Sequence, residues 1–433
     1  MSHYKPYSKY KDSGVEWIGN VPDGWNVARI KRFTSLRNER CTDALEGWRY
    51  IGLEDVESGS GKYRPTEGNS RQNEDSTVGV FRSGDVLYGK LRPYLRKAIV
   101  SDSNGVCSTE FLVMQPTSIM ASWLHQWLLT TEVTQQIEAG CEGTKMPRAD
   151  WEHVGSLYVP SPSQSEQTEI IAVLDRETAS IDAIIAKKTR FIELLKEKRS
   201  ALIIHAVTKG LNPNVKMKDS GVEWIGEVPE HWERRKIAHA FECIGSGTTP
   251  PSDQDKWYSD GEIPWITTGE LRETVITETS KCVTIKALEE FSTLRLYPAG
   301  SLAMAMYGAT IGRLGILGVP ATTNQACCVL SGEISLSIRY AYFWLLAFKQ
   351  QIIDLYAAGG GQPNINQEVI AFLRVPAPNL VEQATITAFL DRETARIDLL
   401  TQKTQHSIDL LKERRSALIT AAVTGQIDLR ESA

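Results

Sequence analysis

The stretch EQTEIIAVLDRETASIDAIIAKKTRFIELLKEKRSALIIHAVT at residues 166–208 contains neither glycine nor proline. A stripe of residues runs along it at alternating steps of four and three, the spacing of one helix face. The stripe consists of Leu174, Thr178, Ile181, Ile185, Lys188, Ile192, Leu195, Arg199, Leu202 and Ala206. Pro162 precedes the stretch and Gly210 follows it, as is typical of helix ends. We predict one long amphipathic helix with a coiled-coil-like seam.

The same stretch occurs a second time. LDRETASID begins at Leu174 and LDRETARID at Leu390, an offset of 390 − 174 = 216, and LLKEKRSALI at Leu194 returns as LLKERRSALI at Leu410. The second stripe consists of Leu390, Thr394, Ile397, Thr401, Thr404, Ile408, Leu411, Arg415, Leu418 and Ala422. Polar residues interrupt both stripes, and such positions more often fix the register of a helix pair than stabilise it. A second long helix with a matching seam is expected.

Another repeated motif opens each half of the chain. KDSGVEWIG spans residues 11–19 and again 218–226, an offset of 218 − 11 = 207. Each copy leads into a matching segment, VPDGW ending at Trp25 and VPEHW ending at Trp232. We expect the tryptophans of these openings to pack in the core, against the domains or the helix ends. The chain therefore contains two complete units.

The segments between the repeats, about 26–155 and 233–372, barely resemble each other. They keep a weak correspondence, because SGDVLYGKLRPYLRKA from Ser83 occupies the place of AGSLAMAMYGATIGRLG from Ala299. A conserved frame with two diverged inserts suggests one scaffold carrying two different recognition domains. Two enzyme domains that diverged after duplication are the alternative.

The helices must pair, because each would be roughly 60 Å long and would otherwise expose its stripe to water. An antiparallel pair brings the end of the first helix near the start of the second, so that one globular domain can bridge them. We expect a mixed α/β (α+β) fold with two globular recognition domains separated by two long antiparallel helices, which form a coiled-coil-like rod with an internal pseudo-twofold repeat. The expected boundaries are 1–160 for domain 1, 161–210 for helix 1, 211–376 for domain 2 and 377–433 for helix 2.

Composition limits the class of protein. The chain has 433 residues, 42% of them hydrophobic, which is enough for two or three domains with ordinary cores. Its formal charge is −5, so any nucleic-acid binding must depend on local basic patches. Seven cysteines give neither a disulfide framework nor zinc-ligand spacing. With no long apolar segment, we expect a cytoplasmic protein that does not contact membranes.

The two openings, the VPSP and VPAP segments at 159–162 and 375–378, and the two repeated helices together resemble the specificity (S) subunit of type I restriction-modification enzymes. The resemblance covers residues 11–429. It implies a non-catalytic subunit with no cofactor and no metal, in which each variable domain is a target recognition domain that reads one half of a bipartite, asymmetric site in double-stranded DNA. It also implies two methyltransferase (modification) subunits docked on the helices, and restriction subunits that supply ATP-dependent translocation and cleavage.

Candidate DNA contacts in the first domain lie in YGKLRPYLRK, where basic and aromatic residues alternate. The candidates are Lys90, Arg92, Tyr94, Arg96 and Lys97. A solvated loop explains any single member equally well. A second basic stretch, from Arg29 to Arg40, either flanks the DNA or forms an exposed helix.

Candidates in the second domain lie in GSGTTPPSD at 245–253 and MYGATIGRLG at 306–315, whose glycines allow close approach to a phosphate or base. Segments of this kind are common in recognition domains of the family. The candidates are Thr248, Thr249, Tyr307, Arg313, Asn324 and Gln325. Asn324 and Gln325 have the chemistry to read adenine, although capping of a turn is an alternative role.

Two loops, GTKMPRAD at 143–150 and GGGQPNIN at 359–366, match loosely. Lys145 and Arg148 in the first, and Gln362 and Asn364 in the second, could meet phosphate, or the loops could simply turn the chain.

Motifs for catalysis are missing. FECIGSG at 241–247 resembles the loop that binds S-adenosylmethionine only weakly, and no motif for holding a flipped adenine follows it. No P-loop occurs, and the seven histidines have no metal-binding spacing. Two alternatives remain open at this point: a two-domain coiled-coil scaffold that binds proteins, and a duplicated DNA methyltransferase-like enzyme.

Overall fold

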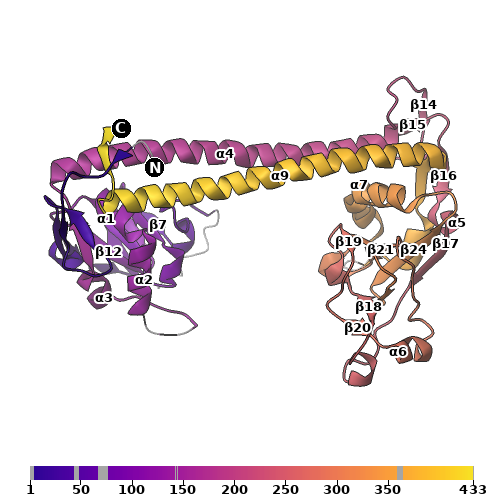
Figure 1. Cartoon of the computed structure of the whole chain (residues 1–433), viewed down its shortest axis with the longest axis horizontal. Helices are drawn as coiled ribbons and strands as arrows, with labels where there is room; N and C mark the ends of the chain where they lie inside the picture. Colours follow the sequence, from indigo (N-terminus) through magenta and orange to yellow (C-terminus); the bar gives the residue numbers. More distant parts are fainter. Residues whose placement is uncertain are drawn as a thin grey trace. The chain divides into compact units, whose positions relative to one another are not determined.

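The computed structural model describes residues 4–42, 48–66, 77–141, 143, 145–357 and 364–432. The chain divides into two compact units. Unit 1 comprises Met1–Thr189 and Gln405–Ala433, and unit 2 comprises Arg190–Thr404. Two long helices, α4 (Gln164–Lys209) and α9 (Leu380–Val423), each contribute one part to unit 1 and the other part to unit 2. The elements are labelled in Figure 1.

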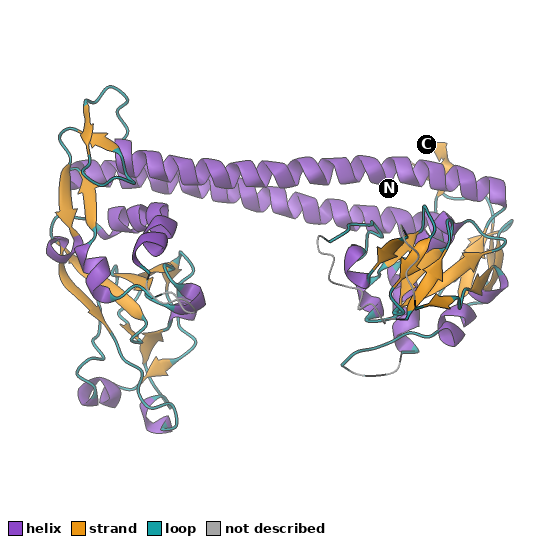
Figure 2. Ribbon diagram, turned by 180° about the vertical axis from the view of Figure 1, so that it is seen from behind, coloured by secondary structure: helices purple, strands orange, loops and turns teal. Residues whose placement is uncertain are grey.

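Unit 1 is built mainly from short antiparallel strands with three short helices. Its strands are β1 (Tyr4–Lys5), β2 (Tyr10–Asp12), β3 (Asn20–Pro22), β4 (Asn26–Arg29), β5 (Thr34–Leu36), β6 (Arg40–Cys41), β7 (Arg49–Ile51), β8 (Val78–Phe81), β9 (Val86–Gly89), β10 (Ala98–Val100), β11 (Gly105–Cys107), β12 (Phe111–Pro116), β13 (Tyr158–Ser161) and β26 (Asp428–Ser432). Its short helices are α1 (Ala121–Leu128), α2 (Thr131–Ala139) and α3 (Trp151–Ser156). Figure 2 shows the strands as orange arrows.

Unit 2 repeats this plan with a longer helix. Its strands are β14 (Met217–Asp219), β15 (Glu227–Pro229), β16 (Glu233–Lys236), β17 (Phe241–Ser246), β18 (Ile263–Ile266), β19 (Val275–Ile276), β20 (Cys282–Val283), β21 (Leu302–Ala305), β22 (Leu314–Leu317), β23 (Thr322–Thr323), β24 (Cys327–Glu333) and β25 (Arg374–Ala377). Its other helices are α5 (Ile237–Ala240), α6 (Ile285–Glu290), α7 (Ile338–Tyr356) and α8 (Gln367–Phe372).

The central sheets of the two units have the same strand order. Unit 1 contains β10-β9-β12-β5, and unit 2 contains β22-β21-β24-β17 with β19 added at the edge beside β22. The register is also kept. Gly89 pairs with Phe111 in one sheet, and Ala305 pairs with Cys327 in the other; each residue of the second pair lies 216 positions after its equivalent in the first (305 − 89 and 327 − 111). Each unit also has a parallel strand pair, β7–β11 or β18–β23. The variable segments therefore share a fold despite their different sequences.

The variable segment of each unit is closed at its base by a two-stranded neck. In unit 1, β4 pairs with β13, and in unit 2, β16 pairs with β25. The necks lead directly into α4 and α9, because α4 begins three residues after β13 ends and α9 begins three residues after β25 ends (164 − 161 and 380 − 377). The chain therefore enters and leaves each variable segment through two adjacent strands.

The long helices pair in antiparallel fashion within each unit, as predicted. In unit 1, Asp182 of α4 lies 3.1 Å from the Arg415 guanidinium of α9, while Glu166, earlier in α4, meets Arg430 beyond the end of α9. In unit 2, Arg199 Nε donates to Asp398 Oδ1 at 3.0 Å. The predicted stripe residues are buried or half-buried along both helices. Both helices end at a glycine with positive φ, Gly210 and Gly425, which confirms the predicted ends.

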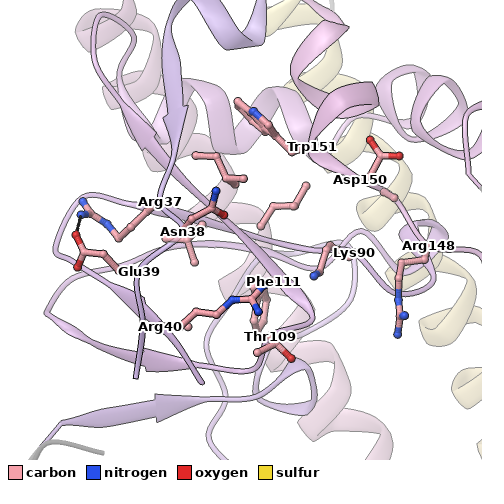
Figure 3. Close-up of a pocket in the computed structure, with 15 residues that line it drawn as sticks. Arg37, Asn38, Glu39, Arg40, Lys90, Thr109, Phe111, Arg148, Asp150 and Trp151 are labelled. Atoms are coloured by element: carbon pink, nitrogen blue, oxygen red, sulfur yellow. Dashed lines mark hydrogen bonds and ion pairs between the residues drawn. The ribbon is translucent and has the colours of Figure 1, made fainter. Parts of the chain in front are cut away.

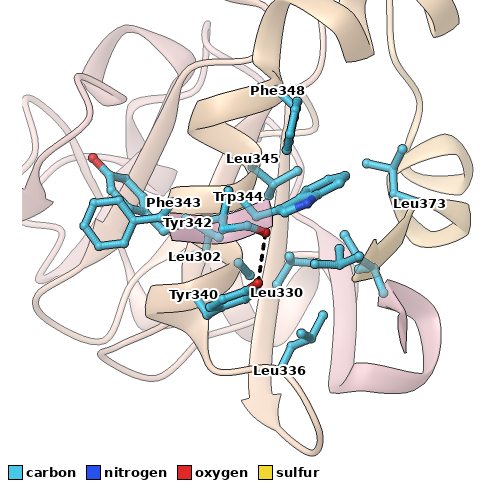
Figure 4. Packing of buried hydrophobic residues seen from close by; sticks show 14 of the residues in the cluster. Leu302, Leu330, Leu336, Tyr340, Tyr342, Phe343, Trp344, Leu345, Phe348 and Leu373 are labelled. Atoms are coloured by element: carbon cyan, nitrogen blue, oxygen red, sulfur yellow. Dashed lines mark hydrogen bonds between the residues drawn. The ribbon is translucent and has the colours of Figure 1, made fainter. Parts of the chain in front are cut away.

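The repeated tryptophans pack where the sequence predicts. Trp25 is buried in unit 1 and donates to Glu166 at 3.2 Å, and Trp232 is buried in unit 2 and donates to Glu382 at 3.2 Å. Trp224 packs on Trp344, whose neighbours on α7 fill the core of unit 2 (Figure 4). Within that core the buried Tyr340 hydroxyl contacts the carbonyls of Val207 and Pro376 at 3.2 and 3.0 Å. α7 is thereby tied to the end of α4 and to β25.

The two chain ends meet in unit 1, where β1 and β26 form a two-stranded sheet (Figure 1). All seven cysteines are free. In the part of the chain that the structure describes, no helix is both long and apolar enough to cross a membrane.

Candidate nucleic-acid interface

Unit 1 brings three segments together at the carboxyl end of β9. The Lys90 amide donates to the Glu110 carbonyl at 2.8 Å, and the Ala149 amide donates to the Lys90 carbonyl at 3.0 Å. Leu91 and Arg148 form an isolated antiparallel bridge. Asp150 then caps α3 by accepting a hydrogen bond from the His153 amide at 2.8 Å. We call Lys90–Arg92, Thr109, Glu110 and Arg148 corner 1.

Unit 2 has the same backbone frame 216 residues later. The Met306 amide donates to the Ala326 carbonyl at 2.8 Å, and the Ile365 amide donates to the Met306 carbonyl at 2.8 Å. Tyr307 and Asn364 form the corresponding bridge. Asn366 caps α8 through the Val369 amide at 2.8 Å. The corresponding residues, Met306–Gly308, Gln325, Ala326 and Asn364, form corner 2.

The two corners differ in charge although their backbones match. Corner 1 carries four ionic side chains: Lys90, Arg92, Glu110 and Arg148. The equivalent positions of corner 2 carry uncharged residues: Met306, Gly308, Ala326 and Asn364. A common frame with different side chains can present two different chemistries to the same kind of ligand.

Corner 1 borders a hollow of about 360 Å³ (Figure 3). Besides Lys90 and Arg148, its lining includes Arg37 and Arg40, while Phe111 and its neighbours supply apolar surface. The Arg37 guanidinium donates to Asp85 at 2.7 Å and to Glu39 at 3.0 Å. These hydrogen bonds raise the pKa of Arg37, and the bond to Asp85 has the largest effect. Burial lowers the pKa of the Lys90 ammonium; the nearby Glu110 carboxylate opposes this shift, and Arg148 and Arg40 add to it. The lining thus holds four cations and two carboxylates, Glu39 and Asp150.

The other predicted residues of unit 1 lie around the short 3-10 helix Pro93–Leu95 or in the loop that precedes α3. Arg92 and Tyr94 are exposed, and Lys145 is exposed in its own loop. Arg96 donates to the Leu129 carbonyl at 3.4 Å and to Thr131 at 3.3 Å. Lys97 donates to the Leu53 carbonyl at 2.6 Å. The structure thus brings Lys90 and Arg148 to the hollow, whereas Arg96 and Lys97 hold loops of the domain together.

The stretch from Arg29 to Arg40 is not the exposed helix that was one of its two sequence interpretations. It contains β4, one short turn of helix at Ile30–Arg32, β5 and the start of β6. β5 and β6 pair with β12 and β8, so strand partners distant in sequence override local helix propensity. Arg37 and Arg40 are lining residues of the hollow that the sequence did not connect with Lys90.

In unit 2 the structure joins two predicted loops. The Thr249 hydroxyl donates to Gln325 Oε1 at 2.5 Å, and the Thr248 carbonyl accepts from the Trp265 indole at 3.1 Å. Gly247 allows this approach, since a Cβ there would lie 1.7 Å from the Thr323 carbonyl oxygen. Asn324 Oδ1 accepts from the Ala326 amide at 3.1 Å, so this side chain does cap a turn.

The remaining predicted residues of unit 2 border this site. Tyr307 is half-buried beside Asn364, and burial raises its pKa. Arg313 lies one residue before β22 and is the counterpart of Lys97, 216 residues earlier. Gln362 lies outside the described residues. Thr109 and Glu110 were missed by the sequence analysis, although subtracting the offset of 216 from the candidate Gln325 would have led to Thr109.

The segment FECIGSG, considered as a cofactor loop, is mostly strand β17, which is paired to β24. No group of three or more potential metal ligands occurs among the residues that are described.

Comparison with known proteins gives a consistent result. A family model, the type I restriction modification DNA specificity domain, matches residues 229–408. The EcoR124I/EcoR124II specificity subunit of Escherichia coli is 23% identical over 261 residues, which cover 59% of this chain and 58% of that protein. The MjaIX specificity subunit of Methanocaldococcus jannaschii is 30% identical over 39% of each protein. The MjaVIII specificity subunit of the same organism is 22% identical over 95% of this chain and 94% of that protein.

Solved structures share the fold. The HsdS subunit from Thermoanaerobacter tengcongensis has a TM-score of 0.54 at 17% identity, over 94% of this chain and 98% of that chain. A chain from a study of complex assembly and conformational transition in the type I R-M system has a TM-score of 0.74 at 17% identity, over 93% of this chain and 98% of that chain. The match thus spans a little over half of the E. coli relative but nearly all of the structural relatives. The family model thus matches the second half of the chain, and the chain is similar to specificity subunits of type I restriction-modification enzymes in sequence and to solved chains of such systems in fold.

Proposed function

We propose that this chain is the DNA sequence-specificity subunit of a type I restriction-modification complex. Residues 1–160 and 211–376 act as target recognition domains, each reading one half of a bipartite, asymmetric site. Residues 161–210 and 377–433 supply the long helices, which serve as spacer and as docking surface for the methyltransferase subunits. The chain itself performs no catalysis; methylation and ATP-dependent cleavage belong to its modification and restriction partners.

The observation that carries this proposal is the pair of corners with one backbone frame and two sets of side chains. A duplicated enzyme would be expected to keep its reacting groups at equivalent positions. Here Lys90, Glu110 and Arg148 are replaced by Met306, Ala326 and Asn364. Change of chemistry on a fixed frame is what two readers of different base sequences require, because specificity comes from side chains that reach base edges. A difference between the corners also favours an asymmetric site over a palindrome.

The proposed DNA contacts are grouped by unit. In unit 1 they are Lys90, Arg92, Tyr94, Arg96, Lys97, Lys145 and Arg148; Arg96 and Lys97 also bond to neighbouring loops. In unit 2 they are Thr248, Thr249, Tyr307, Arg313, Asn324 and Gln325. Exposed Arg92 and Lys145 suit phosphate, whereas the half-buried Lys90 suits a base edge.

The test is a methylation assay with the complex of this chain and its methyltransferase subunits. The substrate is a library of duplexes with randomised positions, and methylated molecules are sequenced. We expect a two-part motif with a fixed gap. Methylation spread evenly over the library, or a single palindromic motif, would contradict the proposal.

A further inference from the structure

The hollow beside corner 1 contains two cations that none of the described side chains neutralises by direct contact. Lys90 follows β9 and Arg40 begins β6, and both line the hollow together with Phe111 (Figure 3). Arg37 and Arg148, the other cations of the lining, are bound to carboxylates. Within the described ranges, neither Lys90 nor Arg40 forms an ion pair or a side-chain hydrogen bond.

These two side chains can only donate hydrogen bonds. In the major groove guanine presents two acceptors, N7 and O6. Adenine presents one acceptor, N7, beside an amino group, and cytosine presents an amino group, so in both bases an amino group opposes the second of two cationic donors. Thymine offers one acceptor beside a methyl group. A paired donor set therefore discriminates in favour of guanine.

The setting of Lys90 favours a base over a phosphate, whereas Arg40, which lines the same hollow, is exposed. Lys90 is half-buried, it lies against the apolar side chains of β12, and its main chain is fixed by hydrogen bonds to Glu110 and Ala149. Phosphates are usually met by mobile, exposed cations, which Arg92 and Lys145 provide in the same unit. A donor held in a hollow can instead require a particular partner, because an unmatched base would leave it without a hydrogen bond.

We propose that Lys90 and Arg40 select a guanine in the half-site read by unit 1. This inference rests on the proposed function, since it names the base that one recognition domain requires. Unit 2 has Met306 at the position of Lys90, so this ammonium donor is absent from the other half-site.

The experiment uses the complex with methyltransferase subunits and the randomised duplex library. The main variant is Lys90→Met, which places in corner 1 the residue that the same backbone frame already holds in corner 2. Arg40→Gln is the second variant and keeps a polar side chain of similar length. Lys11→Met, in the β2–β3 hairpin away from the hollow, is the control.

We expect each test variant to lose its preference for guanine at one position of the first half-site, by about tenfold to a hundredfold, while the second half-site stays unchanged. The control should give the wild-type motif. Equal weakening for all sequences, with a shallower salt dependence, would show a phosphate contact and overturn the inference. An unchanged first half-site in both variants would also overturn it. Loss of any motif in the wild-type complex would instead refute the proposed function.

Discussion

At the level of single residues, Gln325 is the counterpart in unit 2 of Thr109 in unit 1. Its Oε1 accepts from the Thr249 hydroxyl at 2.5 Å, which orients the amide in an exposed position. A glutamine amide matches the N6 and N7 atoms of adenine. We predict that Gln325→Thr lowers the preference for an adenine in the second half-site about tenfold and leaves the first half-site intact, as measured by library methylation. A change confined to the first half-site would contradict this assignment.

His125 makes unit 1 sensitive to acid. Its side chain is buried, Nε2 lies 3.1 Å from the Ala98 carbonyl oxygen, and burial lowers its pKa from 6.5 to about 4. Because the unfolded chain takes up this proton first, stability is lost as the pH falls from 6.5 towards 4. Between pH 7 and 5.5 we predict a loss of about 1 kcal/mol that His125→Gln abolishes. Urea unfolding of both proteins at the two pH values measures it, and identical pH dependence would contradict the prediction.

At the level of elements, the repeat supplies two matched ion pairs between the long helices. Asp182–Arg415 in unit 1 and Asp398–Arg199 in unit 2 are equivalent, since 398 − 182 and 415 − 199 both equal 216. The side chains of Arg415 and Asp182 are 14% and 24% exposed, against 28% and 58% for Arg199 and Asp398. Asp182 also accepts from Lys62 at 2.6 Å, which links the recognition domain to α4.

These environments predict unequal costs. Asp182→Asn should lower the free energy of unfolding by about 1–3 kcal/mol, because it leaves two cations without their carboxylate and one of them largely buried. Asp398→Asn should cost less than about 1 kcal/mol, as for exposed pairs. Denaturant unfolding of the two variants provides the comparison, each serving as the control for the other. Equal costs would show that burial does not distinguish the pairs.

The elements also show what the sequence can predict. The helices and their seams were predictable because the signal is local, with apolar residues from Leu174 to Ala206 spaced for one helix face. The Arg29–Arg40 stretch was not, because its strands depend on partners such as β12, far along the chain. Lys97 looked like a free cation, yet its ammonium contacts a carbonyl 44 residues away. The sequence also could not predict that Arg40 and Lys90 line the same hollow, because this proximity depends on the tertiary fold.

At the level of the whole molecule, the necks determine how separable the two domains are. Asn26 pairs with Ser161 across the neck of unit 1, and Glu233 pairs with Ala377 across the neck of unit 2. A domain that enters and leaves through adjacent strands can be replaced without redirecting the chain on either side. The helices that follow the necks carry repeated sequence, so a domain from another family member should meet the same surroundings.

We therefore predict that exchanging residues 26–155 for the equivalent segment of another specificity subunit changes only one half of the methylated motif. Exchange of 233–372 should change only the other half, and the gap between the halves should stay the same in both because α4 and α9 are untouched. Library methylation with each hybrid in its methyltransferase complex measures all three features. If the motif of a hybrid changed in both halves, base choice would depend on residues outside the exchanged domain. That result would contradict the prediction, because corner 1 and corner 2 lie in separate units.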